Sequence, residues 1–304
     1  MTAHGAGVGR LPLLAVGVTL VLWASAFVAI RHLGDSFSPG ALSLGRLLVG
    51  SAALGVVLAH RGWRTPARRD WPGLVVIGVL WFGLYNVALN AGERRVDAGT
   101  AAMLIQLSPV LVAVLAAVFL GERATRALGA GLLVALAGVA LIATSTSGHG
   151  DRDPVGVLLC LVSAAAYAVS LILQKPLVSR LPAIEVTWIA CTVGAVVCLP
   201  FAGSLLRDAA AASADDLAWV FYLGVFPTAI AFSTYAFALS HMNAGSLAVT
   251  TYLVPPLTVA LSWLLLAEVP PAMAYVGGAL CLVGVALARR RPRARVSPSA
   301  PAGL

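Results

Sequence analysis

Apolar residues occupy long, nearly uninterrupted runs along the chain, and short polar stretches separate one run from the next. About 20 apolar residues in a helix cross a bilayer core about 30 Å thick, and ten runs come close to that length. The runs cover roughly residues 11–30, 39–60, 71–91, 98–120, 126–144, 154–174, 183–205, 217–240, 244–267 and 270–288. Barrel strands alternate apolar and polar residues over short segments. The pattern therefore predicts an all-α integral membrane protein with ten transmembrane helices.

Composition and charge agree with membrane insertion and indicate an orientation. Charged residues make up 11% of the chain, against about 25% in soluble proteins. With the N-terminus in the cytoplasm, fourteen of the twenty Lys and Arg residues lie at the cytoplasmic side, as the positive-inside rule requires. The net charge of +8 is then a topology signal, and we expect no nucleic-acid partner. Of the basic residues nineteen are Arg, a bias typical of GC-rich bacterial genomes. We predict a multi-pass protein of the inner cell membrane, surrounded by lipid, with both termini cytoplasmic.

The second half of the chain repeats part of the first. Residues 98–141 recur 146 positions later as residues 244–287, with fifteen identical positions that include a proline, three glycines and a glutamate. Each half holds five apolar runs, and an odd number of crossings inverts the second copy in the membrane. We predict two inverted five-helix repeats, residues 11–144 and 154–288, followed by a basic tail at 289–304. Inverted repeats are the usual construction of alternating-access carriers, so this architecture predicts a transporter.

Prolines inside the predicted helices mark candidate gates or kinks. Pro109 lies in the fourth run, and Pro255 and Pro256 lie at the matching place in the ninth. A proline removes a helical hydrogen bond and bends the helix, and interrupted helices in matching positions of two halves indicate a transport site. The alternative interpretation is that each proline only bends its helix to fit the neighbouring helices.

Polar and aromatic side chains gather on some runs, whereas the fifth and tenth runs carry almost none. A hydrogen bond between two helices would explain each such residue alone. Together they predict a cavity, because an aromatic, amide and hydroxyl lining suits a small organic solute. The candidate substrate-binding residues are Trp23, Arg46, Tyr85, Asn86, Asn90, Gln106, Tyr167, Gln174, Tyr235, Thr251 and Tyr252.

Arg46 is the one charged residue set well inside an apolar run. An arginine near the membrane centre costs about 2.5–3.5 kcal/mol on insertion scales, so another group must compensate it. Two interpretations stay open. Arg46 either neutralises a carboxylate or phosphate of the substrate, or it binds backbone carbonyls and holds the second helix in place.

Acidic residues are absent from the middle of every predicted helix. Proton-coupled carriers and exporters of cationic drugs usually place a carboxylate there. Glu122 and Glu268, at the ends of the fourth and ninth helices, occupy equivalent repeat positions, and we expect them to cap turns. Neutral, zwitterionic or anionic substrates therefore fit the sequence better than polycations, while the coupling ion and the direction of transport stay open.

Small residues recur at helical spacing in two runs. They are Gly131, Ala135 and Gly138 in the fifth run, and Gly277, Cys281 and Gly284 in the tenth. Small residues let membrane helices approach closely. We predict that these seams pack either within the chain or between two copies, so a homodimer is one of the arrangements that the sequence allows.

Patterns of catalytic or metal-binding residues do not stand out. Asp151 and Asp153 have the spacing of a metal-nucleotide pair, but no carboxylate or histidine cluster accompanies them on a neighbouring apolar face. The four cysteines lie inside apolar runs and show no metal or redox spacing. We predict no enzyme activity, no metal and no cofactor. The alternative function is an integral membrane enzyme or a receptor without transport activity, although neither needs an inverted duplication.

Short motifs in both halves resemble the EamA-type families of the drug/metabolite transporter superfamily. In the first half they are Asn86-Val-Ala-Leu-Asn90, Ala98-Gly-Thr-Ala-Ala102, Pro109, Leu120-Gly-Glu122, Gly131 and Gly138. In the second half they are Tyr235-Ala-Phe-Ala-Leu239, Ala244-Gly-Ser246, Thr251-Tyr-Leu-Val-Pro-Pro256, Leu266-Ala-Glu268 and residues 277–284. The likeness extends from Leu11 to Ala288.

This resemblance implies ten helices in two inverted five-helix repeats, a central cavity, and export of amino acids or other metabolites from bacteria. It does not identify the substrate. One departure is Ser108-Pro109 in one half against Val254-Pro255-Pro256 in the other, which predicts two unequal gates. We therefore expect a secondary exporter of small organic metabolites such as amino acids, working by alternating access.

Overall fold

The computed structural model describes residues 9–34, 36–95, 104–122, 125–146, 153–266 and 272–288, and every regular element in these ranges is a helix. The first half contains α1 (Arg10–Leu33), α2 (Pro39–Arg61), α3 (Trp71–Ile77), α4 (Asn86–Glu93), α6 (Ser108–Phe119) and α7 (Arg126–Thr146). The second half contains α8 (Pro154–Val178), α9 (Ala183–Val197), α10 (Ala202–Ala211), α11 (Ala214–Leu223), α12 (Ala231–His241), α13 (Ala244–Ala248), α14 (Val254–Leu266) and α15 (Ala272–Ala288). The predicted all-α fold class is confirmed for these residues.

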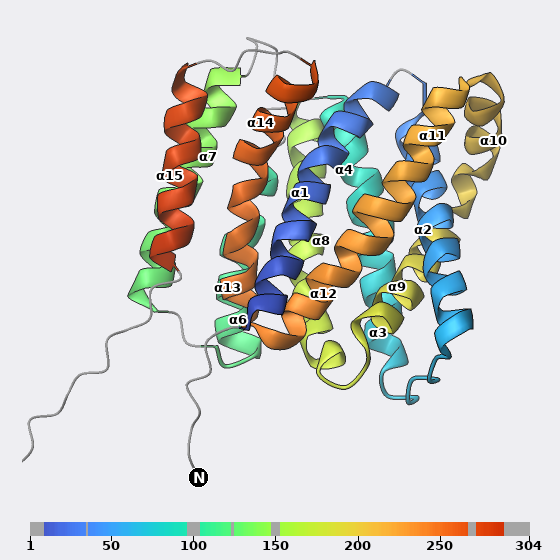
Figure 1. Cartoon of the computed structure of the whole chain (residues 1–304), viewed down its shortest axis with the longest axis horizontal. Helices are drawn as coiled ribbons and strands as arrows, with labels where there is room; N and C mark the ends of the chain where they lie inside the picture. Colours follow the sequence, from blue (N-terminus) through green and yellow to red (C-terminus); the bar gives the residue numbers. More distant parts are fainter. Residues whose placement is uncertain are drawn as a thin grey trace, which may run out of the picture.

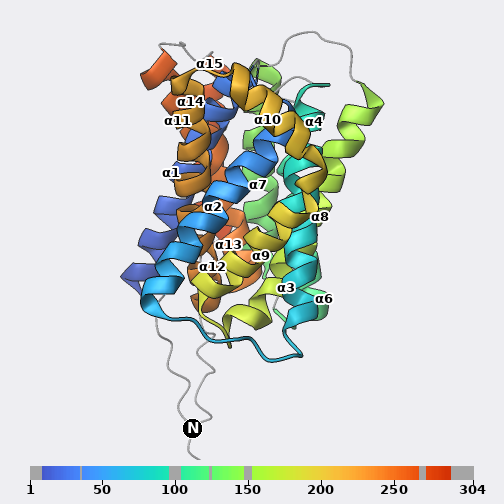
Figure 2. The same cartoon turned by 90° about the vertical axis from the view of Figure 1, so that its right-hand side faces the viewer.

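Most of the helices lie side by side and run between the two ends of the molecule (Figures 1 and 2). Six segments are long and apolar enough to cross a membrane, namely Arg10–Ile30, Pro39–Arg61, Trp71–Gly92, Pro154–Val178, Ala214–His241 and Ala244–Leu261. A bent pair, Ala183–Val197 with Leu199–Ala211, meets at 52° and forms a seventh span if it is counted as one. The described part of the chain is thus a multi-pass helical membrane protein.

Two of the spans contain a π-helical stretch, and the stretches begin 146 residues apart. They are η1 (Gly78–Tyr85), between α3 and α4, and η3 (Gly224–Ile230), between α11 and α12. Each stretch begins with a glycine that lets a neighbouring helix approach closely. A methyl group on Gly78 would lie 2.5 Å from Cβ of Val193 in α9, and one on Gly224 would lie 2.5 Å from Cβ of Val49 in α2.

The helices α7 and α15 pack against each other at one edge of the bundle (Figure 1). A methyl group on Gly138 would lie 2.6 Å from the carbonyl oxygen of Gly277, and one on Gly284 would lie 2.7 Å from that of Gly131. Both seams of small residues predicted from the sequence are confirmed. They are used within the chain, so they provide no argument for a homodimer.

The prolines predicted to kink helices lie where spans change their helical type. Pro109 is in the first turn of α6, directly after a turn at Gln106 and Leu107. Pro255 and Pro256 are in the first turn of α14, which follows the 3-10 helix η4 (Val249–Leu253). Proline suits the first turn of a helix because its missing N–H would have no helical partner there. The two breaks lie directly beside the cavity described below.

Candidate functional site

A cavity lies between helices of both halves. The space between its side chains amounts to about 780 Å³, which includes space that is open to solvent. It is lined by Trp23, Ala26, Phe27, Ile30, Arg46, Trp81, Tyr85, Asn86, Leu89, Asn90, Ile105, Gln106, Ser108, Tyr167, Phe232, Thr251 and Val254. Most of this lining is apolar or aromatic, with a few polar groups, as in sites for small organic molecules.

The cavity lies nearer to the end of the bundle that is opposite the start of α1 at Arg10. On α1 its lining residues begin at Trp23, in the second half of the helix, whereas Arg46 lies in the first third of α2. The last turn of α4 reaches the same end, because Arg94 donates hydrogen bonds of 3.1 and 3.0 Å to the carbonyls of Gly34 and Phe37 in the α1–α2 turn. The arginine distribution predicts that this end is the outer one.

Aromatic rings form the inner wall of the cavity. The Trp81 ring lies 5.1 Å from the rings of both Tyr167 and Phe232, edge to face. The ring of Trp23 lies 4.8 Å from that of Tyr235. Contacts of this kind stabilise aromatic pairs by about 0.5–1.5 kcal/mol beyond their buried area, so the wall is a fixed surface built by α1, η1, α8 and α12.

Three amide side chains on the lining have their nitrogens hydrogen-bonded to other protein groups. The Asn86 amide donates to the carbonyls of Trp81 and Phe82 at 3.1 and 2.9 Å. The Asn90 amide donates to the Pro39 carbonyl at 3.3 Å and to the Ser43 hydroxyl at 3.0 Å. The Gln106 amide donates to the Thr251 carbonyl at 3.4 Å. Since a backbone carbonyl only accepts, these contacts orient all three amides.

Arg46 is the one charged residue on the described lining, and it is 6% exposed. Its Nε donates to the Thr228 hydroxyl at 3.0 Å, and that hydroxyl donates onward to the Leu223 carbonyl at 2.8 Å. Within the described ranges, no carboxylate lies within ion-pair distance of the guanidinium. The contact with Thr228 of η3 holds the side chain in place on the cavity lining.

Eight of the eleven candidate binding residues lie on this lining, namely Trp23, Arg46, Tyr85, Asn86, Asn90, Gln106, Tyr167 and Thr251. The other three lie outside it. Tyr235 stands behind the wall, with its hydroxyl 2.5 Å from that of Tyr167. Tyr252 packs with residues of α7 and α15, and Gln174 is buried in α8 with its Oε1 unpaired among the described residues.

Several apolar lining residues were not among the candidates drawn from the sequence. Phe27 and Ile30 lie one and two turns beyond Trp23 on α1, and Phe232 lies on α12. In a membrane helix an apolar residue facing lipid has the same character as one facing a cavity. The spacing of Phe27 and Ile30 from the candidate Trp23 was the available signal, since it places all three on one helical face.

At the end predicted to be cytoplasmic, two charged side chains hold the turn between α12 and α13. Lys175, near the end of α8, donates to the carbonyls of Leu239 and Met242 at 2.6 and 2.5 Å. Glu122, which follows α6, accepts from the backbone N–H groups of Ala244 and Gly245 at 2.6 and 3.1 Å. The cation meets the C-terminal carbonyls of one helix and the anion meets the first N–H groups of the next, so both charges fit the helix dipoles.

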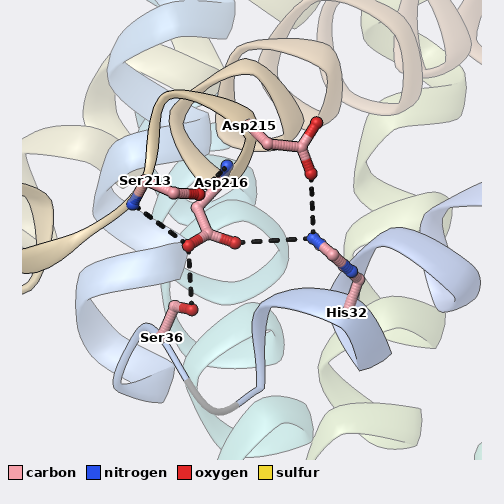
Figure 3. A network of polar contacts seen from close by, with 5 residues as sticks. All are labelled: His32, Ser36, Ser213, Asp215 and Asp216. Carbon is pink, nitrogen blue, oxygen red and sulfur yellow. Dashed lines mark hydrogen bonds and ion pairs between the residues drawn. The ribbon is translucent and has the colours of Figure 1, made fainter.

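At the opposite end, which is predicted to be the outer one, a polar network joins α1 to α11 (Figure 3). The His32 Nε2 lies 3.3 Å from the carboxylate of Asp215 and 3.4 Å from that of Asp216. Asp216 also accepts a hydrogen bond of 3.1 Å from the Ser36 hydroxyl and forms a capping box with Ser213. This network holds the α1–α2 turn of the first half against the second half.

Comparison with known proteins gives a family match over both halves. The sequence profile of the EamA-like transporter family matches residues 11–144 and 154–290. A probable terminal-alkyne amino-acid exporter of Streptantibioticus cattleyicolor is 40% identical over 281 residues, which are 92% of this chain and 94% of that protein. The uncharacterized transporter YdfC of Bacillus subtilis is 31% identical, over 87% of this chain and 86% of its own length. The pseudopaline exporter CntI of Pseudomonas aeruginosa is 29% identical over 92% of this chain and 99% of its own.

A solved structure, described only as the crystal structure of a protein, has the same fold. It superimposes with a TM-score of 0.77 over 93% of this chain and 99% of its own, at 22% sequence identity. At this identity the likeness concerns the arrangement of the helices alone.

Proposed function

The chain belongs to the EamA-like transporter family, and from that premise we propose that it exports small metabolites of the amino-acid type through its central cavity by alternating access. It is a membrane transporter and not an enzyme, as its family and its named relatives are transporters. Two of the relatives are named as exporters, one of them of a terminal-alkyne amino acid. Our proposal that this chain exports the same class of substrate rests on the lining of its cavity.

We infer ten membrane crossings in two inverted repeats, and the mirrored packing supports this. Equivalent positions of the two halves are 144 or 146 residues apart. Exchanging the halves turns the close contact of Gly78 with Val193 into that of Gly224 with Val49. In the same way, the contact of Gly131 with Gly284 becomes that of Gly277 with Gly138. Contacts exchanged in this way are expected when two copies of one unit pack about a twofold axis.

The number of apolar helices fits the same architecture. The six long spans, the bent pair and the three shorter apolar helices Ser108–Phe119, Arg126–Ile142 and Tyr275–Ala288 together provide ten segments. With ten crossings, both termini lie on one side, and the arginine-rich loops assign that side to the cytoplasm.

The observation that carries the proposed function is the cavity between the halves, which contains one buried cation and three oriented amides but no carboxylate among its described lining residues. Trp23, Arg46 and Asn86 come from the first half, whereas Tyr167 and Phe232 come from the second. A site shared in this way opens to one side and then to the other when the halves rock against each other.

The state described here fits an outward-facing carrier. The cavity lies nearer to the outer end, while Glu122, Lys175 and the ion pair of 2.7 Å between Arg180 and Asp70 join elements at the cytoplasmic end. We propose that these cytoplasmic contacts open when the substrate enters from inside the cell.

Counterflow in proteoliposomes tests the function. Liposomes with the purified protein are loaded with one unlabelled apolar amino acid at a time, and uptake of the labelled form is followed. Uptake above that of protein-free liposomes for at least one amino acid supports the proposal. If folded protein, verified by size-exclusion chromatography, shows no such uptake for any amino acid in the panel, the proposal is wrong.

A further inference from the structure

We propose that the cavity binds its substrate as a zwitterion, with the substrate carboxylate on Arg46 and the substrate ammonium group on the side-chain oxygens of Asn86, Asn90 and Gln106. This inference rests on the proposed function and adds a binding polarity to it. It requires both charged ends of an α-amino acid, and a substrate side chain that is uncharged.

The guanidinium of Arg46 has donors that the protein leaves unused. Its Nε is bound to Thr228 at 3.0 Å, and no described group accepts from its two terminal nitrogens. Arg46 lines the cavity, so these nitrogens are the donors that it can offer to a solute there. A guanidinium pairs with a carboxylate through two parallel hydrogen bonds. A substrate carboxylate would therefore compensate a cation that is otherwise costly at this depth in the membrane.

The two asparagine amides have both N–H groups bound, and Gln106 has one N–H group bound. The Asn86 nitrogen donates to the carbonyls of Trp81 and Phe82. The Asn90 nitrogen donates to the Pro39 carbonyl, and the Gln106 nitrogen donates to the Thr251 carbonyl. No described group donates a hydrogen bond to the side-chain oxygens of these three amides. None of these oxygens is a fully enclosed atom that lacks a partner. Each oxygen has two lone pairs, and all three residues line the cavity, where an ammonium group has three N–H donors to offer.

The donors and the acceptors lie within a short distance of each other on the fold. Asn86 and Asn90 are four residues apart in α4, so they share one helical face. Asn90 binds Ser43 of α2, and Ser43 is one turn from Arg46. An α-amino acid carries its two charged groups on one carbon atom, which matches this proximity of opposite binding groups.

Neutral acceptors distinguish this site from a site for free cations. A carboxylate on the wall would attract any amine, whereas amide oxygens and the faces of Trp81 and Tyr167 hold an ammonium group weakly. Weak contacts suit a carrier, since the solute must leave again. The apolar residues Phe27, Ile30 and Val254 complete the lining, and they provide no partner for a charged substrate side chain.

The test uses three compounds that differ in one charged group. These are L-leucine, L-leucinamide, which lacks the carboxylate, and 4-methyl-2-oxopentanoate, which lacks the ammonium group. Each competes with the counterflow of the labelled apolar amino acid found for the wild-type protein in the preceding experiment. We expect each analogue to need at least about tenfold higher concentration than L-leucine for half inhibition, because each loses charge-assisted hydrogen bonds.

Variants test the assignment to residues. Arg46→Gln is expected to lose the preference for L-leucine over L-leucinamide, while its preference over the oxo acid persists. The matched control is Arg207→Gln, an exposed arginine at the outer end, which is expected to keep both preferences. If Arg46→Gln does not fold, the competition series on the wild-type protein decides alone.

The outcomes separate the two proposals. Absence of any amino-acid counterflow would contradict the proposed function and this inference together. Counterflow that either analogue inhibits as well as L-leucine does would overturn the zwitterion site and leave the proposed function standing. The same holds if Arg46→Gln retains the full preference for L-leucine over L-leucinamide.

Discussion

The carboxylate of Glu122 accepts the backbone N–H of Ala244 at 2.6 Å and thereby joins the two halves of the chain. Both residues belong to the internal repeat, in which Glu122 is equivalent to Glu268, and Ala244 to Ala98. The sequence predicted that Glu122 caps a turn at the end of its own helix, whereas its carboxylate accepts from the first N–H groups of α13 in the other half. Glu268 and Ala98 lie outside the described residues, and the repeat predicts an equivalent contact between them when the carrier faces inward.

Glu122→Gln is expected to loosen the cytoplasmic closure. The glutamine side chain lacks the negative charge that favours the start of α13. Loss of such a contact is expected to destabilise the closed state by about 1–2 kcal/mol. In a background without the four native cysteines, all of which are buried, Ala248→Cys serves as a reporter, because Ala248 is fully buried in α13. Its labelling by a maleimide from the cytoplasmic side should become about five to thirty times faster. Asp215→Asn, at the outer end, is the control that should leave the rate unchanged.

Lys175→Met is expected to open the same turn from its other side. Lys175 neutralises the carbonyls of Leu239 and Met242, where α12 ends, and methionine keeps the length of the side chain without the donors. Lys175→Arg should restore most of the closure. Because Glu122 and Lys175 hold one turn, their effects on the labelling of Ala248→Cys should not add in the double variant. If the effects of the two single variants on the labelling rate simply added in the double variant, the two residues would not act on the same turn.

The α7–α15 seam gives a prediction about stability. Gly138→Leu places a side chain where a single methyl group would already lie 2.6 Å from the Gly277 carbonyl oxygen. Overpacking of this kind costs about 1–3 kcal/mol or more, so the thermal unfolding temperature in detergent should fall. Gly129→Ala in the same helix is the matched control, because nothing lies within 4 Å of its added methyl group. Equal unfolding temperatures for the two variants would contradict the close packing.

Asp153 provides a pH dependence outside the membrane-spanning segments. The hydrogen bond with Arg95, at 2.8 Å, and that with the Val155 N–H hold the pKa of Asp153 below its ordinary value of 3.8. A lowered pKa stabilises the folded state above the ordinary pKa, and that stabilisation is lost as the pH falls through the lowered value. Asp153→Asn should therefore flatten the decline of the unfolding temperature below about pH 4. An unchanged decline would assign the acid sensitivity to other carboxyl groups.

The helical spans were predictable from the sequence because their signal is local. Twenty apolar residues in a row have one stable solution in a bilayer, a helix with its backbone groups paired internally. Polar lining residues were predictable for the same reason, since Asn86, Asn90 and Gln106 stand out in an apolar run. The π-helical stretches were not predicted, because the packing of Gly78 and Gly224 against other helices accompanies them and depends on the tertiary structure.

For three of the eleven candidate residues, the sequence did not predict which side of the helix faces the cavity. Tyr235 was predicted to contact substrate, but it stands one layer behind, with its hydroxyl against that of Tyr167. Tyr252 packs toward α7 and α15 although its neighbour Thr251 lines the cavity. Rotating a helix by one residue exchanges such neighbours, and that rotation is decided by packing with distant segments. The roles of these tyrosines in binding stay predictions.

Sidedness is the prediction on which the inverted architecture depends most. Glu122 and Glu268 occupy equivalent positions of the two repeats. If each repeat crosses the membrane five times, the second copy is inverted and the two glutamates face opposite compartments. In the cysteine-free background, Glu122→Cys should react with a membrane-impermeant maleimide from the cytoplasmic side, and Glu268→Cys from the outer side.

The labelling is done on intact cells and on inside-out vesicles, so that each variant is tested from both sides. Arg64→Cys, in the loop before α3 that is predicted to be cytoplasmic, and Ala212→Cys, between α10 and α11 and predicted to be outside, are the reference positions for the two compartments. In the proposed orientation the contact between Glu122 and Ala244 closes the cytoplasmic end, and its repeat equivalent is expected to close the opposite end. Reaction of both glutamate positions from one compartment would therefore remove the physical basis for alternating access in this chain.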